Sequence, residues 1–510
     1  MPPPLSILTS VNDNNSWWRA SMKGTLKQLE RAIDKATTYD EWYEASQEHD
    51  RLSGADRWKE VDRSPYYDYE LIRNRLWQIR QARERNDVNK LVFHLHEGLH
   101  GNLGNISNPR LYQHSRVGTK RLIENYLSEV STALNYLCDS NFKEFGLKEK
   151  LDFFETTGQA FGQSCLMLSG GAALGLFHIG VARCLWKQNL LPSVISGSSA
   201  GSIIASVVGT HNDEELKVKL EPENIYLEAF KVLGWKGLVR GTPVLDGDHL
   251  EACLEENISD MTFEEAYRHT GREINITVSP YDRNQRARLL NWRTSPNVLI
   301  RKASLASCAI PSIYPPVSLW AKNIDGERVP YIPGRKFVDG SIVDDLPIRR
   351  LARLYGVNHS IVSQTNPHIV PFLSRNENTD SSLSTLGDWA LRNVSMNLRY
   401  GLQLVQHQVA SNDLGLIIDK AKSMVTQKYI GDINMIPPRQ PLNALRILNN
   451  PTLQDVQTYI RKGEQATWPK LDMVANTTCI SRTFRDCRAR LDRIEERMLD
   501  RVNMTSIANQ

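Results

Sequence analysis

Several features that would assign a chain to a specialised class of protein are missing from this sequence. Its seven cysteines form no CxxC pair, which argues against a zinc ribbon or a dense disulfide framework and indicates reduced thiols. The first residues show no basic segment followed by an apolar one, so we expect no signal peptide and a protein that is not secreted. The net charge of only +4 argues against a dedicated nucleic-acid binder.

Ligands for a metal ion are also scarce. His94, His96 and His100 lie close together, but no cysteine or carboxylate pattern near them has the spacing of a zinc site. We therefore expect neither a metal ion nor a cofactor.

Long hydrophobic runs of the kind that cross membranes are not convincing here. Residues 163–182 and 188–212 carry no charged side chain and have the length of a membrane span. Both runs are rich in glycine and serine, and Pro192 interrupts the second. A buried strand followed by a buried helix has the same hydropathy, and we interpret both runs in that way.

The composition and length predict a folded protein with a sizeable core. Hydrophobic residues make up 41% of 510 residues, enough for one large domain or two to three ordinary ones. Residues 1–150 are predicted to form a helical, Trp-rich N-terminal region. Residues 163–363 form the predicted catalytic domain, and residues 364–510 a helical C-terminal region with a flexible segment near 376–384.

The central region predicts an α/β fold with a mainly parallel sheet. Five short segments rich in aliphatic or β-branched residues are strand-like, and helical patterns separate them. They are SCLML, PSVIS, INITVS, KFVDGS and HSIVS. Strands that alternate with helices form βαβ units, whose strands lie parallel in one sheet.

GSSAG at residues 197–201 fits the pattern GxSxG of a nucleophile elbow. In such an elbow a serine stands on a tight turn between a strand and a helix, which exposes its hydroxyl. PSVIS before the turn and SIIASVV after it can supply that strand and helix. Gly197 and Gly201 keep the flanking positions small, because larger side chains would collide across the turn. Ser199 is the candidate nucleophile, and a purely structural Gly-Ser turn is the alternative.

A glycine-rich loop, LSGGAALG at residues 168–175, precedes the elbow. Such a loop between a strand and a helix presents backbone N–H groups to an anion. A dinucleotide fingerprint would need glycine where this chain has Ala172, and an acidic residue where GSSAG stands. An oxyanion hole beside a serine uses the same amides, and a phosphate site is the alternative.

Asp339 and Gly340, in KFVDGS, form the third element. Asp-Gly is common in turns, so the pair alone indicates little. A serine nucleophile needs a base, however, and an aspartate at a strand end beside the elbow is a candidate for it.

At these three places the sequence resembles the patatin-like lipid acyl hydrolases. The likeness covers GGAALG up to Gly175, GSSAG with Ser199, the pair Asp339–Gly340, and SLASCAIPSIYPPV at residues 304–317. The chain is also similar to the patatin-domain triacylglycerol lipases of yeasts, filamentous fungi and plants. That likeness extends over residues 16–470 and includes the Trp-rich N-terminal stretch.

The resemblance implies a patatin-like three-layer α/β fold, flanked by helical N- and C-terminal regions. It implies a dyad, in which Ser199 attacks an ester carbonyl and Asp339 accepts its proton. The amides of Gly170, Gly171 and Ala172 would hold the oxyanion. The product of the first step would be an acyl-enzyme that water resolves.

Two positions depart from the wider patatin pattern, which has glycine at position 172 and a basic residue at position 174. Ala172 still has an N–H group but tolerates fewer backbone angles than glycine. Leu174 removes a positive charge, which favours a neutral glycerolipid as the substrate. The alternatives are a phospholipase or lysophospholipid acyl hydrolase, a transacylase on the same dyad, and a catalytically silent protein of the lipid-droplet surface.

An ordinary α/β-hydrolase would combine GxSxG with a later acid and a histidine. His359, His368 and His407 follow Asp339 in the chain, so their order allows that alternative. The glycine-rich loop before the elbow favours the dyad. No histidine begins the HxxxxD signature of glycerolipid acyltransferases.

Residues 224–241 place Phe230 and Trp235 among Lys231 and Lys236, a pattern compatible with contact with a lipid surface. The pattern fits either an interfacial helix or a core helix. The resemblance implies a protein at the cytosolic face of lipid droplets or of the endoplasmic reticulum, peripheral or monotopic. We expect a neutral glycerolipid and that membrane surface as partners, and no nucleic acid.

Overall fold

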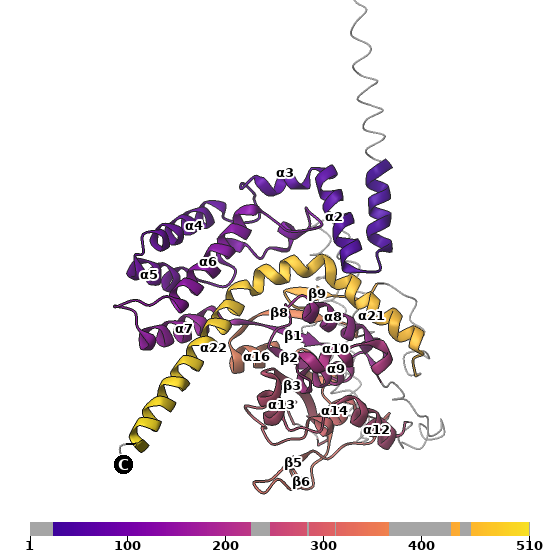
Figure 1. Ribbon diagram of the computed structural model, residues 1–510. Coiled ribbons are helices and arrows are strands. Elements are labelled where there is room, and N and C mark those ends of the chain that lie inside the picture. Colours follow the sequence, from indigo (N-terminus) through magenta and orange to yellow (C-terminus); the bar gives the residue numbers. More distant parts are fainter. Residues whose placement is uncertain are drawn as a thin grey trace, which may run out of the picture. The chain divides into compact units, whose positions relative to one another are not determined.

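The structure is a computed structural model in which the chain forms two compact units (Figure 1). Unit 1 joins Met1–Gly162 to Trp468–Gln510, and unit 2 spans Gln163–Thr467. The structure describes residues 24–225, 245–282, 285–311, 313–366, 430–438 and 450–508.

The predicted C-terminal region, 364–510, is divided between these two units. Its first part belongs to unit 2, and its last helix belongs to unit 1. The segment near 376–384 and nearly all of 224–241 lie outside the described residues.

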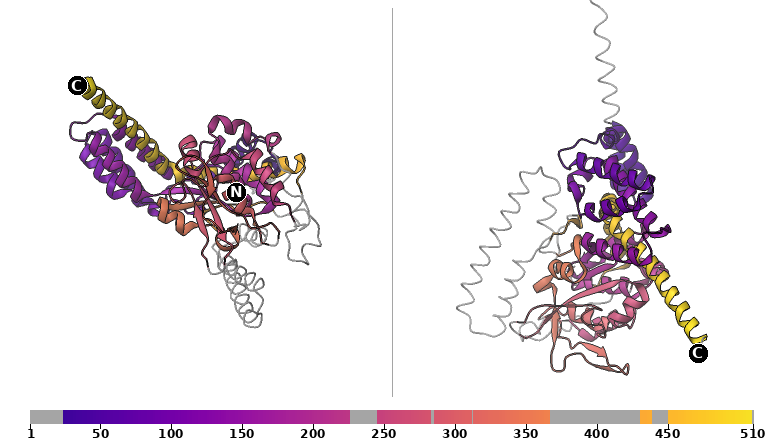
Figure 2. Two further views of the ribbon diagram at one scale, coloured as in Figure 1. Left: turned by 90° about the horizontal axis from the view of Figure 1, so that it is seen from below. Right: turned by 90° about the vertical axis from the view of Figure 1, so that its left-hand side faces the viewer.

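Unit 1 is helical. Its α-helices are α2 (Tyr39–Ser53), α3 (Ala55–Glu60), α4 (Tyr69–Glu84), α5 (Val88–Gly98), α6 (Arg121–Asp139), α7 (Leu147–Phe161) and α22 (Leu471–Ala508). Short 3₁₀ turns are η1 (Leu103–Asn105), η2 (Pro109–Tyr112) and η5 (Trp468–Lys470). Helix α22 runs beside α6 and α7, where Phe484 and Leu491 enter the core (Figure 2).

Local sequence explains where these helices begin. Helix α2 starts at a capping box, in which the Thr38 hydroxyl accepts the Glu41 amide and the Glu41 carboxylate accepts the Thr38 amide. Trp42 of α2 is 4% exposed and packs against Trp468, as expected for an aromatic core residue.

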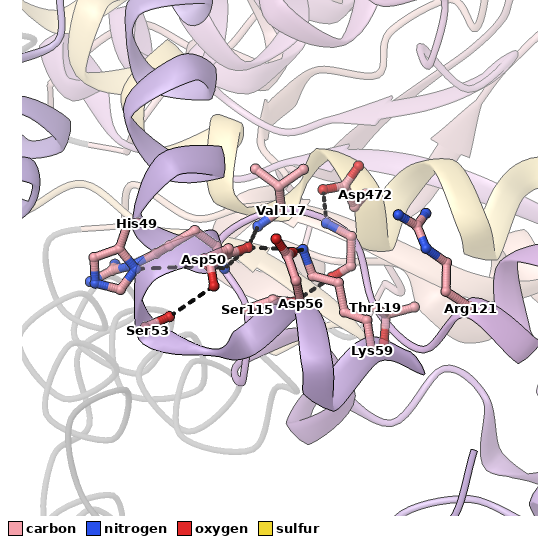
Figure 3. A network of polar contacts seen from close by, with 12 residues as sticks. His49, Asp50, Ser53, Asp56, Lys59, Ser115, Val117, Thr119, Arg121 and Asp472 are labelled. Carbon is pink, nitrogen blue, oxygen red and sulfur yellow. Dashed lines mark hydrogen bonds and ion pairs between the residues drawn. The ribbon is translucent and has the colours of Figure 1, made fainter. Parts of the chain in front are cut away.

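A buried aspartate holds a loop of unit 1 in place (Figure 3). The Asp50 carboxylate accepts the amides of Arg116 and Val117, at 2.8 and 3.1 Å, and the Lys59 ammonium at 3.0 Å. On the same loop the Gly118 amide donates to Asp472. Burial lowers the pKa of Lys59, but its hydrogen bonds to Asp56 and Asp50 raise that pKa above its ordinary value. The network serves folding, because each bond fixes backbone or balances a charge.

Unit 2 is built on a seven-stranded sheet among the described residues. Its strands are β1 (Gln163–Leu168), β2 (Val194–Gly197), β3 (Glu273–Pro280), β4 (Arg288–Leu290), β7 (Phe337–Asp339), β8 (Val357–Ser363) and β9 (Ile433–Met435). The order is β4-β3-β2-β1-β8-β9, with β7 also paired to β3. Only the pairs of β3 with β4 and with β7 are antiparallel. The five predicted strands are therefore confirmed, and so is the mainly parallel sheet.

Helices and a small hairpin surround this sheet. The helices are α8 (Leu176–Lys187), α9 (Ala200–Thr210), α10 (Asp213–Lys219), α12 (Gly247–Asn257), α13 (Phe263–Thr270), α14 (Ile300–Cys308), α15 (Ser341–Asp344), α16 (Ile348–Tyr355) and α21 (Leu453–Thr467). Strands β5 (Trp320–Lys322) and β6 (Arg328–Pro330) form the hairpin. Short 3₁₀ turns are η3 (Ala172–Gly175) and η4 (Pro222–Asn224).

Opposite faces of the sheet are covered by different helices, which makes three layers (Figure 1). On one face, Cys165 and Val194 form a buried cluster with Leu351 of α16. On the other face, Ile274 packs against α9, where Gly209 leaves room for its side chain. Side chains alternate along a strand, so neighbouring residues reach different helices.

The two uncharged runs form strands and helices of this core. The first run holds β1 and most of α8, and the second holds β2 and α9. Among the helices that the structure describes, none combines the length and the apolarity that a membrane span needs.

Candidate active site

The predicted elbow has the geometry that exposes a serine. Ser199 lies two residues after the end of β2 and occupies the N-cap position of α9, with φ 50° and ψ −126°. A non-glycine residue with such positive φ is strained, and the strain is typical of a nucleophile elbow. A Cβ at Gly197 would lie 2.3 Å from the Gly201 carbonyl oxygen, and one at Gly201 would lie 2.2 Å from that of Leu168. The turn therefore requires both glycines.

The Ser307 hydroxyl links the backbone of Ser199 to that of β3. The Ser199 amide donates to the Ser307 hydroxyl at 2.9 Å, and Ser307 in turn donates to the Thr277 carbonyl at 2.8 Å. Ser199 is 5% exposed, at the edge of a cavity. Because it precedes α9, the positive end of that helix dipole lies at its side chain.

Asp339 lies at the end of a strand that meets the elbow. Val278 of β3 pairs with Arg288 on one edge and with Asp339 on the other, so β7 uses the edge that β2 also uses. On that edge Gly197 is opposite Ile276. The register positions of Gly197 and Asp339 are thus two residues apart along β3, about 7 Å.

The glycine-rich loop lies between the two predicted catalytic residues. A Cβ added at Gly170 would be 3.4 Å from the Ser199 Cβ and 3.1 Å from the Ser341 Cβ. The Ser341 amide donates to the Asp339 carboxylate at 2.7 Å. Ser199, Gly170 and Asp339 therefore gather at one point, and a direct hydrogen bond from Ser199 to Asp339 stays a prediction.

The amides predicted for the oxyanion hole are not equivalent. The Gly170 amide donates to the buried Asp345 carboxylate at 2.8 Å, so it is not free for an oxyanion in this arrangement. Gly171 and Ala172 begin η3, and the first amides of a helix have no partner within it. Gly175 packs against Ala200, where a Cβ would come within 2.6 Å of the alanine Cβ. The candidate donors therefore narrow to Gly171 and Ala172.

Gly340 is also required by close packing. A Cβ at this position would lie 2.2 Å from the carbonyl oxygen of Thr277. Thr277 is the residue whose carbonyl accepts the Ser307 hydroxyl, so the elbow and the Asp-Gly pair contact the same peptide of β3.

His178 and Asp345 support the site and were not predicted from the sequence. His178 is fully buried, and its ring nitrogens bond to the Ser363 hydroxyl at 2.7 Å and the Ser169 carbonyl at 2.9 Å. Burial lowers the pKa of His178 to about 4, so the ring is neutral and its N–H can donate to Ser169. Both residues act on backbone groups of the loop, and no sequence pattern signals such contacts.

An apolar cavity begins at Ser199. It holds about 1030 Å³ of empty space, counting the part open to solvent. It runs along α9 to Val207, a distance of about 12 Å at the rise of a helix. Its aliphatic lining includes Leu176, Ile179, Ile203, Ile204, Val207, Leu220, Ile225 and Leu250, with Lys219 and Asn257 as polar members. Its shape and lining suit a hydrocarbon chain beside the serine.

The histidines of the alternative triad do not gather at Ser199 in the described part of the chain. His359 lies on β8, and its Nδ1 bonds to Ser164 at the start of β1. Ser199 instead follows the carboxyl end of the parallel strand β2, at the opposite end of these strands. His368 and His407 lie outside the described residues. His94 and His96 are on helix α5, where His96 bonds to Thr157.

Two family models match the chain. A model described as patatin-like phospholipase matches residues 166–352, which include the elbow, the glycine-rich loop and Asp339. A model described only as a domain of unknown function, DUF3336, matches residues 18–159 of unit 1.

Curated relatives match over most of the chain. Triacylglycerol lipase 4 of Saccharomyces cerevisiae is 36% identical, over 86% of this chain and 50% of its own length. Triacylglycerol lipase SDP1L of Arabidopsis thaliana is 34% identical, over 92% and 59%. This chain thus spans about half to three fifths of these relatives. Triacylglycerol lipase ptl3 of Schizosaccharomyces pombe is 31% identical, over 89% of this chain and 95% of its own length.

Among solved structures, VipD from Legionella pneumophila is similar with a TM-score of 0.25 and 13% identity, over 48% of this chain and 55% of VipD. That likeness is too distant to bear on function. The relatives and the matched catalytic region agree with the site geometry. The chain belongs to the patatin-like phospholipase family.

Proposed function

We propose that the protein is a lipid acyl hydrolase that cleaves carboxylic esters of neutral glycerolipids, a triacylglycerol lipase. The observation that carries the proposal is the meeting of the strained Ser199, the Asp339 strand end and the loop amides at the mouth of an apolar cavity. Relatives at 31–36% identity are named triacylglycerol lipases, which supports the same reaction.

In the proposed mechanism the Ser199 hydroxyl attacks the ester carbonyl while Asp339 takes its proton. The C–O bond to the glycerol breaks, the proton passes to the leaving alkoxide, and an acyl-enzyme forms. Water then attacks this ester with Asp339 again as the base, which releases the fatty acid. The amides of Gly171 and Ala172 stabilise both oxyanions, and such a donor contributes about 2.7–4 kcal/mol.

The cavity supports a lipid acyl group as the substrate. An extended acyl chain lying along α9 would bury its methylene groups at about 0.8 kcal/mol each. Position 174 is leucine, so this residue brings no cation to an anionic head group. A neutral glycerolipid therefore fits better than a phospholipid, and the family model named for phospholipases keeps the phospholipid as the second candidate.

The same proposal places the protein on the cytosolic face of lipid droplets or of the endoplasmic reticulum. A lipase for an insoluble substrate must work at a lipid surface. Flotation of purified protein with triolein droplets coated by a phospholipid monolayer would test this. Recovery of the protein with the droplets supports the location, and recovery only in the soluble fraction contradicts it.

The reaction itself is tested on purified full-length protein with triolein, dioleoylglycerol, phosphatidylcholine and a soluble p-nitrophenyl ester. We expect Ser199→Ala and Asp339→Asn to lose at least about 10³-fold in turnover. Two matched controls are Ser206→Ala, a buried serine of the same helix, and Asp344→Asn, an acid near the same strand. Both should stay within a few-fold of the unchanged protein.

A fluorophosphonate probe should label Ser199 in the unchanged protein and nothing in Ser199→Ala. Folded protein without Ser199-dependent labelling or turnover would favour the catalytically silent surface protein. A turnover of phosphatidylcholine above that of triolein would make the protein a phospholipase on the same dyad. Transfer of the acyl group to an added lipid alcohol would identify transacylation.

A further inference from the structure

Asp345 connects three segments of the catalytic unit, and none of the steps above uses it. It follows α15 and is 1% exposed. Its Oδ1 accepts the Gly170 amide at 2.8 Å, and its backbone carbonyl accepts the Ser198 hydroxyl at 3.0 Å. Its Oδ2 accepts the Asn366 side-chain amide at 3.5 Å. One residue thus reaches the glycine-rich loop, the elbow and the segment after β8.

The bond to Gly170 bears directly on the oxyanion donors. The Gly170 amide belongs to the peptide between Ser169 and Gly170, which Asp345 holds. The next peptide carries the Gly171 amide, the first of the two remaining donors, and its carbonyl at Gly170 accepts the Thr365 hydroxyl at 3.3 Å. The opposite side of the loop is also confined, because a Cβ at Gly171 would lie 2.2 Å from the Thr365 hydroxyl. The loop is therefore held between Asp345 and Thr365, with one charged anchor.

The charge of this anchor can change within an ordinary pH range. Burial raises the pKa of Asp345 to about 7, and the charges of Asp339 and Asp344 act in the same direction. The bonds from Gly170 and Asn366 act against this rise. Asp339 on β7 and Asp344 on α15 are the charged neighbours whose negative charges raise the pKa of Asp345. His178 contacts the same loop at Ser169 and is neutral near pH 7.

We propose that Asp345 is a positioning residue, whose ionised carboxylate holds the Gly170 peptide so that the Gly171 and Ala172 amides face the oxyanion formed at Ser199. This proposal rests on the proposed function. An ionised carboxylate is the stronger acceptor for an amide, because charge-assisted hydrogen bonds are about twice as strong as neutral ones. Turnover then depends on Asp345 being ionised, although the carboxylate touches no substrate.

The test compares kcat and KM of the unchanged protein, Asp345→Asn and Asp345→Ala with a soluble p-nitrophenyl ester between pH 5 and pH 9. We expect kcat of the unchanged protein to fall as the pH drops below about 7. Asp345→Asn keeps an oxygen acceptor, so its kcat should fall less than about tenfold and lose that step near pH 7. Asp345→Ala should lose about 10²-fold in kcat, with KM changed less than threefold.

The matched control is Asp344→Asn, the same change at the neighbouring residue, which pairs with Arg350 and makes no bond to the loop. It should keep the step near pH 7, moved to slightly lower pH because one negative charge is gone. A step that persists unchanged in Asp345→Asn, or a wild-type kcat in Asp345→Ala, would overturn the proposal.

A second measurement separates this proposal from the proposed function. Hydrogen exchange of the amides in residues 168–175 needs no turnover, and it should speed up at least tenfold in Asp345→Ala and not in Asp344→Asn. If Ser199 proves inactive but exchange responds in this way, the loop is held as proposed and only the hydrolase is wrong. If Ser199 is active and exchange is unchanged, Asp345 does not position the loop.

Discussion

Both units of the molecule hold a loop with a buried aspartate, but the two aspartates differ in what surrounds them. The Asp50 carboxylate in unit 1 accepts hydrogen bonds from two backbone amides and from the Lys59 ammonium, so a positive charge in direct contact balances its negative charge. Asp345 in unit 2 receives the Gly170 amide, while the negative charges of Asp339 and Asp344 oppose its ionisation. In unit 1, the Lys59 ammonium thus balances the negative charge of the buried aspartate. In unit 2, the buried aspartate has a pKa of about 7.

The different surroundings of Asp50 and Asp345 agree with the different loops that they hold. The loop at residues 115–119 is fixed by backbone bonds to Asp50, whose carboxylate also bonds to the Lys59 ammonium. In the proposed function, the loop at residues 169–172 presents amides to the oxyanion, and Asp345 fixes the backbone of that loop.

The largest effect is expected for Asp50→Ala. Asp50→Ala removes the buried acceptor of the Arg116 and Val117 amides and one of the two carboxylates that bond to Lys59, and we expect a loss of about 3–5 kcal/mol in the free energy of unfolding of unit 1. Hydrogen exchange resolved by peptide measures this in each unit separately. Exchange should rise in residues 115–119 and stay unchanged in residues 168–175. A rise confined to the second loop would contradict the comparison.

Asp345→Asn should have the opposite sign, and its effect should depend on pH. The pKa of Asp345 is raised in the folded state, so ionisation destabilises the fold. That penalty is absent below pH 3.8, grows as the pH rises to about 7, and is constant above it. The variant removes the penalty, and at pH 8 we expect it to be more stable by up to about 4 kcal/mol.

Urea unfolding from pH 4 to pH 8 measures the difference in the free energy of unfolding between Asp345→Asn and the unchanged protein. The difference should grow with pH. Asp50→Asn is the matched change in the other unit and should destabilise at every pH in this range, since it removes one of the two carboxylates that bond to the Lys59 ammonium. Equal pH dependence in both variants would show that the two aspartates are alike.

The smallest effect is expected at Ala172, whose φ of 47° is unfavourable for a residue with a Cβ. Ala172→Gly should relieve that strain and gain about 0.5 kcal/mol, after the entropy of the added glycine is subtracted. Ala173→Gly is the matched control, because Ala173 is helical and glycine costs about 1 kcal/mol there. Thermal unfolding of both variants should give shifts of opposite sign.

Much of unit 2 could be predicted, because the sequence patterns that indicate its strands and turns involve neighbouring residues. The strands around Ser199 are short aliphatic runs, and the elbow needs small residues immediately beside the serine. A Cβ added at Gly197, Gly201 or Gly340 would lie 2.2–2.3 Å from a backbone oxygen, so the spacing of glycine in the chain already reflects the turn. The Asp339 strand end was found in the same way.

The residues missed from the sequence act across long separations. Asp345 bonds to a backbone amide 175 residues away, and Ser307 to one 108 residues away. A backbone amide has no identity in the sequence, so a contact with it leaves no paired pattern to read. The same reason hides His178, whose partner at Ser169 is a carbonyl.

Local composition and periodicity were enough to predict that unit 1 is helical, five strands of unit 2 and the turn that carries Ser199. They act through neighbouring residues, whose sizes and polarities decide the backbone conformation. Three other features arise only when the chain folds in three dimensions. Helix α22 packs in the N-terminal unit, Gly197 and Asp339 share one edge of β3, and Asp345 bonds to the Gly170 amide. Each of these joins segments that are distant in the chain, and packing and burial set their energies.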